Sequence, residues 1–206
     1  MATMPTPRAS ARPLLALLAG WLLASRGPPA PTGRSASGAL PLPAARETPI
    51  GRALGPDLAA HPGLSGIHLL AHPHDAFAAR VLLARAAERT LDVQYYIWRG
   101  DTTGTLLLAE LLAAAERGVR VRLLLDDLGT AGLDAPLATL NHHPNVEVRL
   151  FNPFMLRRPK VLGYLAAPRR ANRRMHNKSF TADNQASIVG GRNVGDEYFG
   201  ATQGVL

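Results

Sequence analysis

The sequence predicts an α/β fold, with a mostly parallel β-sheet flanked by helices. Two observations lead to this prediction. Between residues 75 and 151, helical patterns alternate with short β-rich runs, which is typical of parallel strands joined by crossover helices. The 206 residues, 47% of them hydrophobic, are also enough for one domain with its own core.

Three helices and three strands make up this alternation. Strands are predicted from alternating or continuous β-branched and aliphatic residues, and helices from apolar spacing with a polar cap at the start. Asp75 would cap the first helix, Gly118 would end the second, and Asp126-Asp127 would close the second strand. In chain order, the elements are a helix at 75–89, a strand at 91–98, a helix at 106–117, a strand at 119–125, a helix at 133–141 and a strand at 146–151.

Two segments precede the predicted domain. Residues 1–26 combine Arg8 and Arg12 with an apolar run, which is typical of a signal peptide or membrane-targeting leader and short for a membrane span. A start codon assigned too far upstream would explain the same residues. Residues 27–56 are rich in Pro, Gly, Ser and Ala, so we predict a disordered linker there and a folded domain at 57–206.

The formal net charge of +8 is unevenly distributed. Residues 1–56 carry +5, residues 57–156 carry −3 and residues 157–206 carry +6, which favours a polyanionic partner such as an anionic membrane or nucleic acid. The stretch 157–174 has no acid, and we predict that it meets anionic lipid headgroups, with a solvated loop as the alternative. Its cations are Arg157, Arg158, Lys160, Arg169, Arg170, Arg173 and Arg174.

The most informative stretch begins at His176. His176 and Lys178 are two residues apart, so a β-strand would place the imidazole and the ammonium group on one face and Asp183 on the other. Only two of the 23 basic residues are lysines. Lysine and arginine are not interchangeable, so a lysine here favours a specific role over an ordinary strand histidine with a solvated neighbour.

A second apolar run, 186–189, follows after a tight connection. It ends in Gly190-Gly191, a pair that suits positive φ or close backbone approach, and Asn193 comes next. The imidazole, the cation and the amide could therefore converge on one phosphate. The cation and the amide would hold phosphate oxygens while the imidazole attacks or transfers a proton.

The pattern is His-x-Lys, four residues, Asp, six residues and Gly-Gly-x-Asn. It resembles the HKD motif of the phospholipase D superfamily, in which the glycine pair is often Gly-Ser. The longer runs at 91–98, 120–130, 172–181 and 190–200 resemble bacterial cardiolipin synthases of the C type, so the resemblance spans about residues 57–200. It implies a phospholipase D-like αβα sandwich, of which this chain would be one half-unit.

The resemblance also implies a chemistry. His176 would be the nucleophile of a two-step transfer and become a phosphohistidine, and no metal or other cofactor would be needed. With His176, the resemblance implies Lys178 and Asp183 as catalytic residues, Asp183 in a supporting role. Lys178 and Asn193 would also bind the phosphate, where Gly190 and Gly191 would allow close backbone approach. The chain has no cysteine, which excludes disulfides, thiolate metal sites and cysteine nucleophiles.

One departure from the family concerns the number of motifs. Superfamily enzymes need two facing motifs, and this sequence contains one. Two explanations of the single motif remain. The chain is a piece of a longer enzyme, whose C-terminal half would supply the second motif, or it is a half-unit that works as a homodimer. Whether the chain alone is an active enzyme is open for the same reason.

The resemblance further implies partners and a location. We expect an anionic, phosphatidylglycerol-like phospholipid and a membrane surface as partners, at the bacterial cell membrane or the periplasmic side of the envelope. Cardiolipin synthesis is the expected reaction. The alternatives are an HKD-type nuclease or other phosphodiesterase that acts as a homodimer, and an inactive membrane-binding fragment. The leader and the lipid-synthase resemblance count against nucleic acid as the partner.

Overall fold

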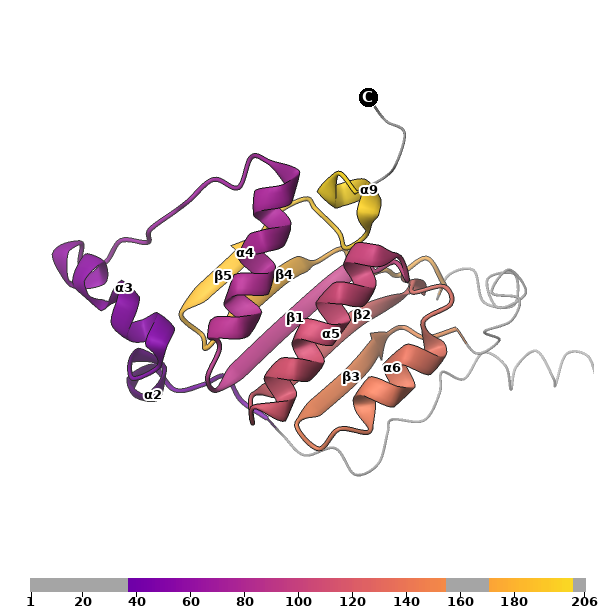
Figure 1. The fold of residues 1–206 in the computed structure, drawn as a ribbon, viewed down its shortest axis with the longest axis horizontal. Helices are drawn as coiled ribbons and strands as arrows, with labels where there is room; N and C mark the ends of the chain where they lie inside the picture. The colour runs from indigo at the N-terminus through magenta and orange to yellow at the C-terminus, as the bar shows by residue number, and fades with distance from the viewer. Residues whose placement is uncertain (1–36, 155–170, 202–206) are drawn as a thin grey trace, which may run out of the picture. The chain divides into compact units, whose positions relative to one another are not determined.

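The structure, a computed structural model, describes residues 37–154 and 171–201 of the chain. Its labelled helices and strands belong to one compact unit, made of Ala36–Pro153 and Arg173–Leu206. The predicted leader lies outside the described residues, as does most of the basic stretch. In chain order the elements are α2 (Leu42–Arg46), α3 (Pro49–Ala60), α4 (Pro73–Ala86), β1 (Thr90–Ile97), α5 (Thr102–Glu116), β2 (Arg120–Gly129), α6 (Asp134–Asn141), β3 (Val146–Phe151), β4 (Lys178–Ala182), β5 (Ala186–Val189) and α9 (Asp196–Phe199) (Figure 1).

The five strands form one sheet in the order β3-β2-β1-β4-β5. β1, β2 and β3 are parallel neighbours, as expected for strands that are joined by the helices α5 and α6. β4 pairs antiparallel with both β1 and β5. The predicted α/β fold, a sheet flanked by helices, is confirmed. The sheet is mixed because β4 and β5 form a hairpin after the parallel part.

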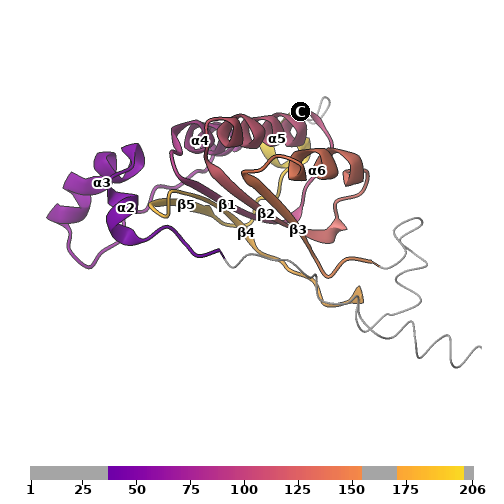
Figure 2. The same ribbon diagram turned by 90° about the horizontal axis from the view of Figure 1, so that it is seen from below.

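Helices α4, α5 and α6 lie on one face of the sheet (Figure 2). The strand residues beneath them are apolar and alternate with residues that face the other way, the period-2 pattern of a sheet with one buried face. In β1, Leu91, Val93 and Tyr95 are buried, whereas Asp92 and Gln94 are only partly buried. The core therefore lies between the sheet and these three helices.

The predicted element types are confirmed for the six helices and strands between residues 73 and 151, while several boundaries differ. α4 begins at Pro73, because proline is favoured at the first position of a helix, and Asp75 lies in the first turn instead of capping it. α5 begins after Asp101, whose side chain accepts a hydrogen bond from the Gly104 amide. β2 does not close at Asp126-Asp127 but continues to Gly129.

The prediction of a disordered linker at 27–56 is wrong for residues 42–46 and 49–56, which are helical. Thr48 joins the two helices, since its buried hydroxyl donates to the Ala45 carbonyl and accepts from the Gly51 amide. A Cβ on Gly51 would lie 2.3 Å from the Ala45 carbonyl oxygen, so only glycine allows this packing. Pro49 is the first residue of α3, and Gly51 allows α3 to pack against α2. Because both residue types are also common in disordered linkers, composition alone suggested disorder where a helical pair forms.

Candidate active site

The candidate site lies at the carboxyl end of β1. The sheet continues from β1 to β2 on one side, whereas β4 lies on the other side, so the strand order reverses at β1. In open α/β sheets, ligands commonly bind near the carboxyl ends of the parallel strands. Lys178 is the register partner of Tyr95 near the end of β1, and His176 comes two residues earlier. The first part of the motif is therefore placed at the carboxyl end of β1.

His176, Lys178 and Tyr96 form a cluster of contacts. The Lys178 Nζ atom lies 3.2 Å from His176 Nδ1 and donates to the His176 carbonyl oxygen at 3.1 Å. The Tyr96 ring packs against the imidazole with 4.4 Å between the ring centroids. It also lies 5.5 Å from the lysine nitrogen. Because His176 is exposed, an incoming phosphate can reach the imidazole and the ammonium group together.

Lys178 carries its charge in a partly buried position. Burial lowers the pKa of its ammonium group from the ordinary value. Within the part of the chain that the structure describes, its contacts are with His176 and the Tyr96 ring, and none is a carboxylate. A cation that is partly desolvated and has no carboxylate partner there is suited to an anionic ligand.

Asn193 approaches the same end of β1 from the loop after β5. Its side chain is 5% exposed, and its Oδ1 atom accepts a hydrogen bond from the Ile97 amide at 3.1 Å. The amide oxygen is thereby used, which leaves the NH₂ group of Asn193 as a donor. Ile97 directly follows Tyr96, so Asn193 and His176 contact neighbouring positions of β1. The structure therefore brings three predicted residues, His176, Lys178 and Asn193, to one end of the strand.

Gly190 and Gly191 lead from β5 to Asn193. Both are exposed, and a Cβ on either would meet no described atom within 4 Å. Gly190 has a φ of 149°, a backbone conformation that residues with a side chain rarely adopt. This conformation explains why glycine occupies the position. That the pair admits close approach to a phosphate remains a prediction.

Asp183 lies at the opposite end of β4, away from the cluster. Its carboxylate is fully buried and accepts hydrogen bonds from the amides of Glu88, Arg89 and Thr90 at 2.8–2.9 Å. Thr90 is the first residue of β1, whereas His176 lies beside the last residues of that strand. Asp183 therefore does not contact His176, and its hydrogen bonds support the bracing role expected for it.

An irregularity in β2 lies opposite Tyr96. Tyr95 pairs with Leu125 and Ile97 pairs with Gly129, so three residues of β2 face Tyr96 alone. Bulges of this kind often re-aim side chains next to active sites. A Cβ on Gly129 would lie 2.1 Å from the Tyr96 carbonyl oxygen, so glycine is required for this close approach. Asp126 is the first of these three residues.

The bulge brings Asp126 into contact with the segment that precedes His176. The Asp126 carboxylate pairs with the Arg174 guanidinium at 3.0 Å, and the side chain of Arg174 is only 11% exposed. This corrects one part of the predicted lipid-binding stretch, because the guanidinium of Arg174 binds a buried carboxylate and is not a solvent-facing headgroup contact. Residues 155–170 of that stretch lie outside the described residues.

Sequence reasoning missed Tyr96 and Asp126 as members of the site. The strand prediction at 91–98 gave Tyr96 no role, and Asp126 was interpreted only as the end of a strand. Two signals pointed to them: an aromatic residue at the end of a buried strand, and an acid pair directly after an apolar run. Neither signal shows that a bulge joins the two residues to the motif.

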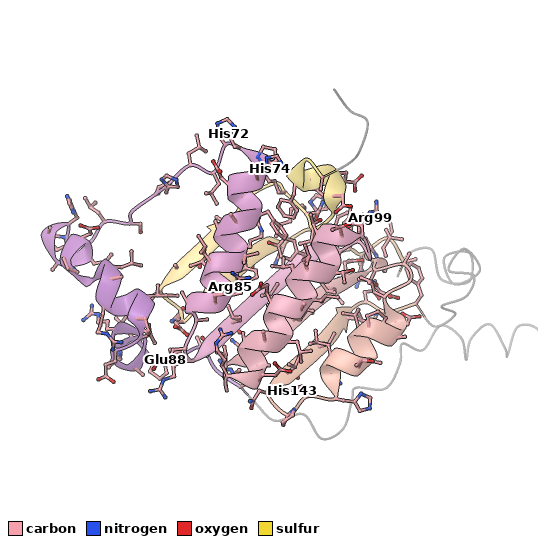
Figure 3. The ribbon with its side chains drawn as sticks, viewed as in Figure 1. His72, His74, Arg85, Glu88, Arg99 and His143 are labelled. Carbon is pink, nitrogen blue, oxygen red and sulfur yellow. The ribbon has the colours of Figure 1, made fainter. Side chains whose placement is uncertain are left out.

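A surface hollow of about 440 Å³ near the start of α5 is a poor alternative site. Figure 3 labels one of its lining residues, Arg99, beside α9. The Arg99 guanidinium is 3.4 Å from the Glu197 carboxylate, and Asp101 and Asp196 add two more acids to the lining. The two aspartates accept backbone hydrogen bonds that attach α9 to the start of α5. This hollow is therefore acidic and structural, and it does not suit a phosphate.

Comparisons with known proteins place the chain in a family. Cardiolipin synthase C of Escherichia coli (strain K12) is 62% identical over 141 residues, which cover 68% of this chain and 30% of that protein. An uncharacterized protein of Helicobacter pylori (strain ATCC 700392 / 26695) is 44% identical over 155 residues, which cover 74% of this chain and 31% of that protein. Among solved structures, NucT from Helicobacter pylori aligns with a TM-score of 0.47 and 16% identity, covering 64% of this chain and 74% of that chain.

The aligned part of this chain thus spans 30–31% of the length of these two curated relatives. The family model described as "Cardiolipin synthase, PLD-like domain" matches residues 81–203, which is more than half of the chain and includes the complete motif from His176 to Asn193. The chain therefore belongs to the family of cardiolipin synthases with a phospholipase D-like domain.

Proposed function

We propose that this chain provides one half of an active centre that transfers phosphatidyl groups between phospholipids, with His176 as the nucleophile. The observation that carries the proposal is the cluster at the end of β1. An exposed imidazole lies 3.2 Å from a partly desolvated ammonium group, and the buried Asn193, whose amide oxygen accepts from Ile97, keeps its NH₂ group as a donor at the neighbouring position of the same strand. This set can hold one phosphate and attack it.

The reaction would proceed in two steps. An imidazole nitrogen of His176 attacks the phosphorus of the donor lipid, a P–N bond forms, and the P–O bond to the leaving alcohol breaks. The leaving oxygen takes a proton from an acid on the facing half. In the second step that group removes a proton from the incoming alcohol, whose oxygen attacks phosphorus and releases the imidazole.

Lys178 and Asn193 would act on the phosphate oxygens during both steps. Negative charge builds up on these oxygens as phosphorus is attacked, and an ammonium group and an amide donor in a partly desolvated site stabilise it. Asp183 would act only through the fold, because its carboxylate is occupied by three backbone amides at the other end of β4. Gly190 and Gly191 would let the loop backbone approach the phosphate.

The substrate class follows from the family and the relatives. Cardiolipin synthase C is 62% identical over 141 residues, so we propose that phosphatidylglycerol-like lipids are donor and acceptor and that cardiolipin is the product. The second half-site would come from another copy of this chain or from a further segment of a longer protein. We place the reaction at a membrane surface of the bacterial envelope. Among the described residues, no helix combines the length and apolar character needed to span a bilayer.

The test is to trap the covalent intermediate. The 206-residue chain is mixed with phosphatidylglycerol in detergent micelles, quenched in alkali, which preserves phosphohistidine, and measured by intact-protein mass spectrometry. We expect an adduct of one phosphatidyl group that is absent in His176→Ala. His68→Gln, which changes an exposed histidine in the loop before α4, should keep the adduct.

Light scattering and lipid analysis of the same samples identify the second half-site and the product. Cardiolipin formed by a dimer would establish a site built from two copies. An adduct without cardiolipin would assign the second half to a further segment. A folded protein that forms neither adduct nor cardiolipin would contradict the proposal, and hydrolysis of a nucleic acid by wild type but not by His176→Ala would favour the nuclease alternative.

A further inference from the structure

Asp126 is a fully buried carboxylate that uses both of its oxygens. Oδ1 accepts from the Leu128 amide at 2.9 Å and from Arg174 Nη1 at 3.0 Å. Oδ2 accepts from the Met175 amide at 2.8 Å. The last two partners lie 48 and 49 residues further along the chain, immediately before His176. One side chain of β2 therefore holds the segment that carries the candidate nucleophile.

We propose that Asp126 is the positioning residue of the transfer reaction, which sets the location of His176 by fixing the side chain of Arg174 and the backbone of Met175. The inference rests on the function proposed above, in which His176 is the nucleophile. In that function, Asp126 does not touch the reacting atoms. It acts through the two residues that precede the imidazole.

The need for such a residue follows from the local backbone. Residues 173–177 lie outside any strand or helix, so their backbone amides lack the regular partners that a sheet supplies. Asp126 provides a partner for one of these amides. Arg174 also donates to the Asn152 carbonyl at 3.2 Å, and the Asn152 side chain donates to the Arg173 carbonyl at 2.8 Å. The segment is thereby anchored to the ends of β2 and β3.

The β2 bulge connects this anchor to the other support of the imidazole. Three residues of β2, Asp126 among them, stand opposite Tyr96, and the Tyr96 ring packs on the His176 ring with 4.4 Å between the centroids. The imidazole is thus supported by Tyr96 from β1, while its chain is held by Asp126 from β2. A carboxylate that served only to stabilise the sheet would not need to bond to two successive residues of an irregular segment.

The experiment compares the wild-type chain with Asp126→Asn, which keeps the size of the side chain but replaces one acceptor oxygen by a donor. The matched control is Asp92→Asn, which breaks the Asp92–Arg122 ion pair between the same two strands on the part-exposed sheet face. Three quantities are measured: amide hydrogen exchange per residue, the ¹⁵N resonances of the His176 ring, and the affinity for inorganic phosphate.

We expect Asp126→Asn to speed amide exchange at residues 174–177 more than about tenfold and to shift the His176 ring resonances. Phosphate affinity should fall by about tenfold, since small displacements of a positioned group cost one to two orders of magnitude. Asp92→Asn should match the wild type in all three. If the wild-type chain binds no phosphate, the proposed function loses support, whereas exchange and ring resonances still decide the role of Asp126.

Two results would overturn the proposal. The first is amide exchange at 174–177 that is unchanged, or that increases no more than the exchange across β1, β2 and β3. Either outcome would mean that Asp126 stabilises the fold as a whole and does not position His176. The other is faster exchange with unchanged ring resonances, because the position of His176 would then not depend on the anchor. If Asp126→Asn does not fold, Arg174→Gln decides by the same criteria, since it keeps the bond between the Met175 amide and Asp126.

Discussion

The two ends of the β1–β4 pair hold their motif residues in opposite ways. At the amino end of β1, Asp183 is fully buried, and its carboxylate is occupied by three backbone amides. At the carboxyl end, His176 is exposed and contacts Lys178 and the ring of Tyr96. Lys178 and Asp183 are five residues apart along β4, which corresponds to about 16–17 Å at about 3.3 Å per residue.

This difference separates residues that share one sequence motif into two physical classes. A carboxylate saturated by buried amides stabilises the fold and has no capacity left for a substrate. An exposed imidazole beside a partly desolvated cation adds little to stability and is available for chemistry. The first class should therefore respond to mutation with unfolding and the second with loss of transfer.

The largest effect is expected at the exposed end. His176→Ala should abolish the phosphatidyl adduct, a loss of more than about 10³-fold in rate, as for nucleophiles in general. Because the side chain is exposed, the free energy of unfolding should change by no more than about 0.5 kcal/mol. Urea unfolding and adduct formation, measured on one preparation, check the predicted stability and the predicted loss of transfer. A marked stability loss would show that His176 belongs to the structural class.

At the buried end, Asp183→Ala should lower the free energy of unfolding by about 3–5 kcal/mol, because it leaves three buried amides without an acceptor. Asp183→Asn should cost roughly half as much, since it keeps one acceptor oxygen, and asparagine also tolerates the positive φ of 51° at this position. Urea denaturation gives both values. Equal losses in the two variants would mean that the acceptor oxygen kept by asparagine does not preserve the hydrogen bonds of the carboxylate.

Lys178 should set the alkaline limit of phosphate binding. Burial lowers the pKa of its ammonium group, so the cation loses its proton at a lower pH than an exposed lysine does. Phosphate affinity should therefore be maintained below that lowered pKa and decrease as the pH rises through it. Lys178→Arg, which keeps its charge throughout, should move this decrease to higher pH. Identical alkaline profiles for the two proteins would remove Lys178 from phosphate binding.

The smallest effect is expected for Tyr96, which supports the imidazole from one side. Tyr96→Leu should weaken phosphate binding by up to about tenfold, because an aromatic contact contributes about 0.5–1.5 kcal/mol. Tyr96→Phe keeps the ring and should stay within about threefold of the wild type. Titration with inorganic phosphate distinguishes the two variants. If both variants lose affinity equally, the hydroxyl group of Tyr96 contributes and ring packing alone does not explain its role.

Much of the fold was predictable because it depends on local patterns. The alternation of Leu91, Val93 and Tyr95 predicted β1, and the parallel order of the first three strands followed from helices between them. The linker prediction failed because residues such as Pro49 and Gly51 favour disorder in a linker but start a helix and allow close packing in a helical pair. Composition cannot distinguish the two, since the decision depends on what Gly51 packs against.

The sequence by itself determined the α/β fold class and the set of polar residues in the motif, because residue identity and period are properties of the chain alone. Only the tertiary structure decided which of those residues meet. Asp183 is seven residues from His176 in the sequence but lies at the other end of β4. Asp126 is 50 residues from His176 but holds the residues next to it. The reason is that strand pairing and the bulge in β2 set these positions, and both depend on contacts between distant segments.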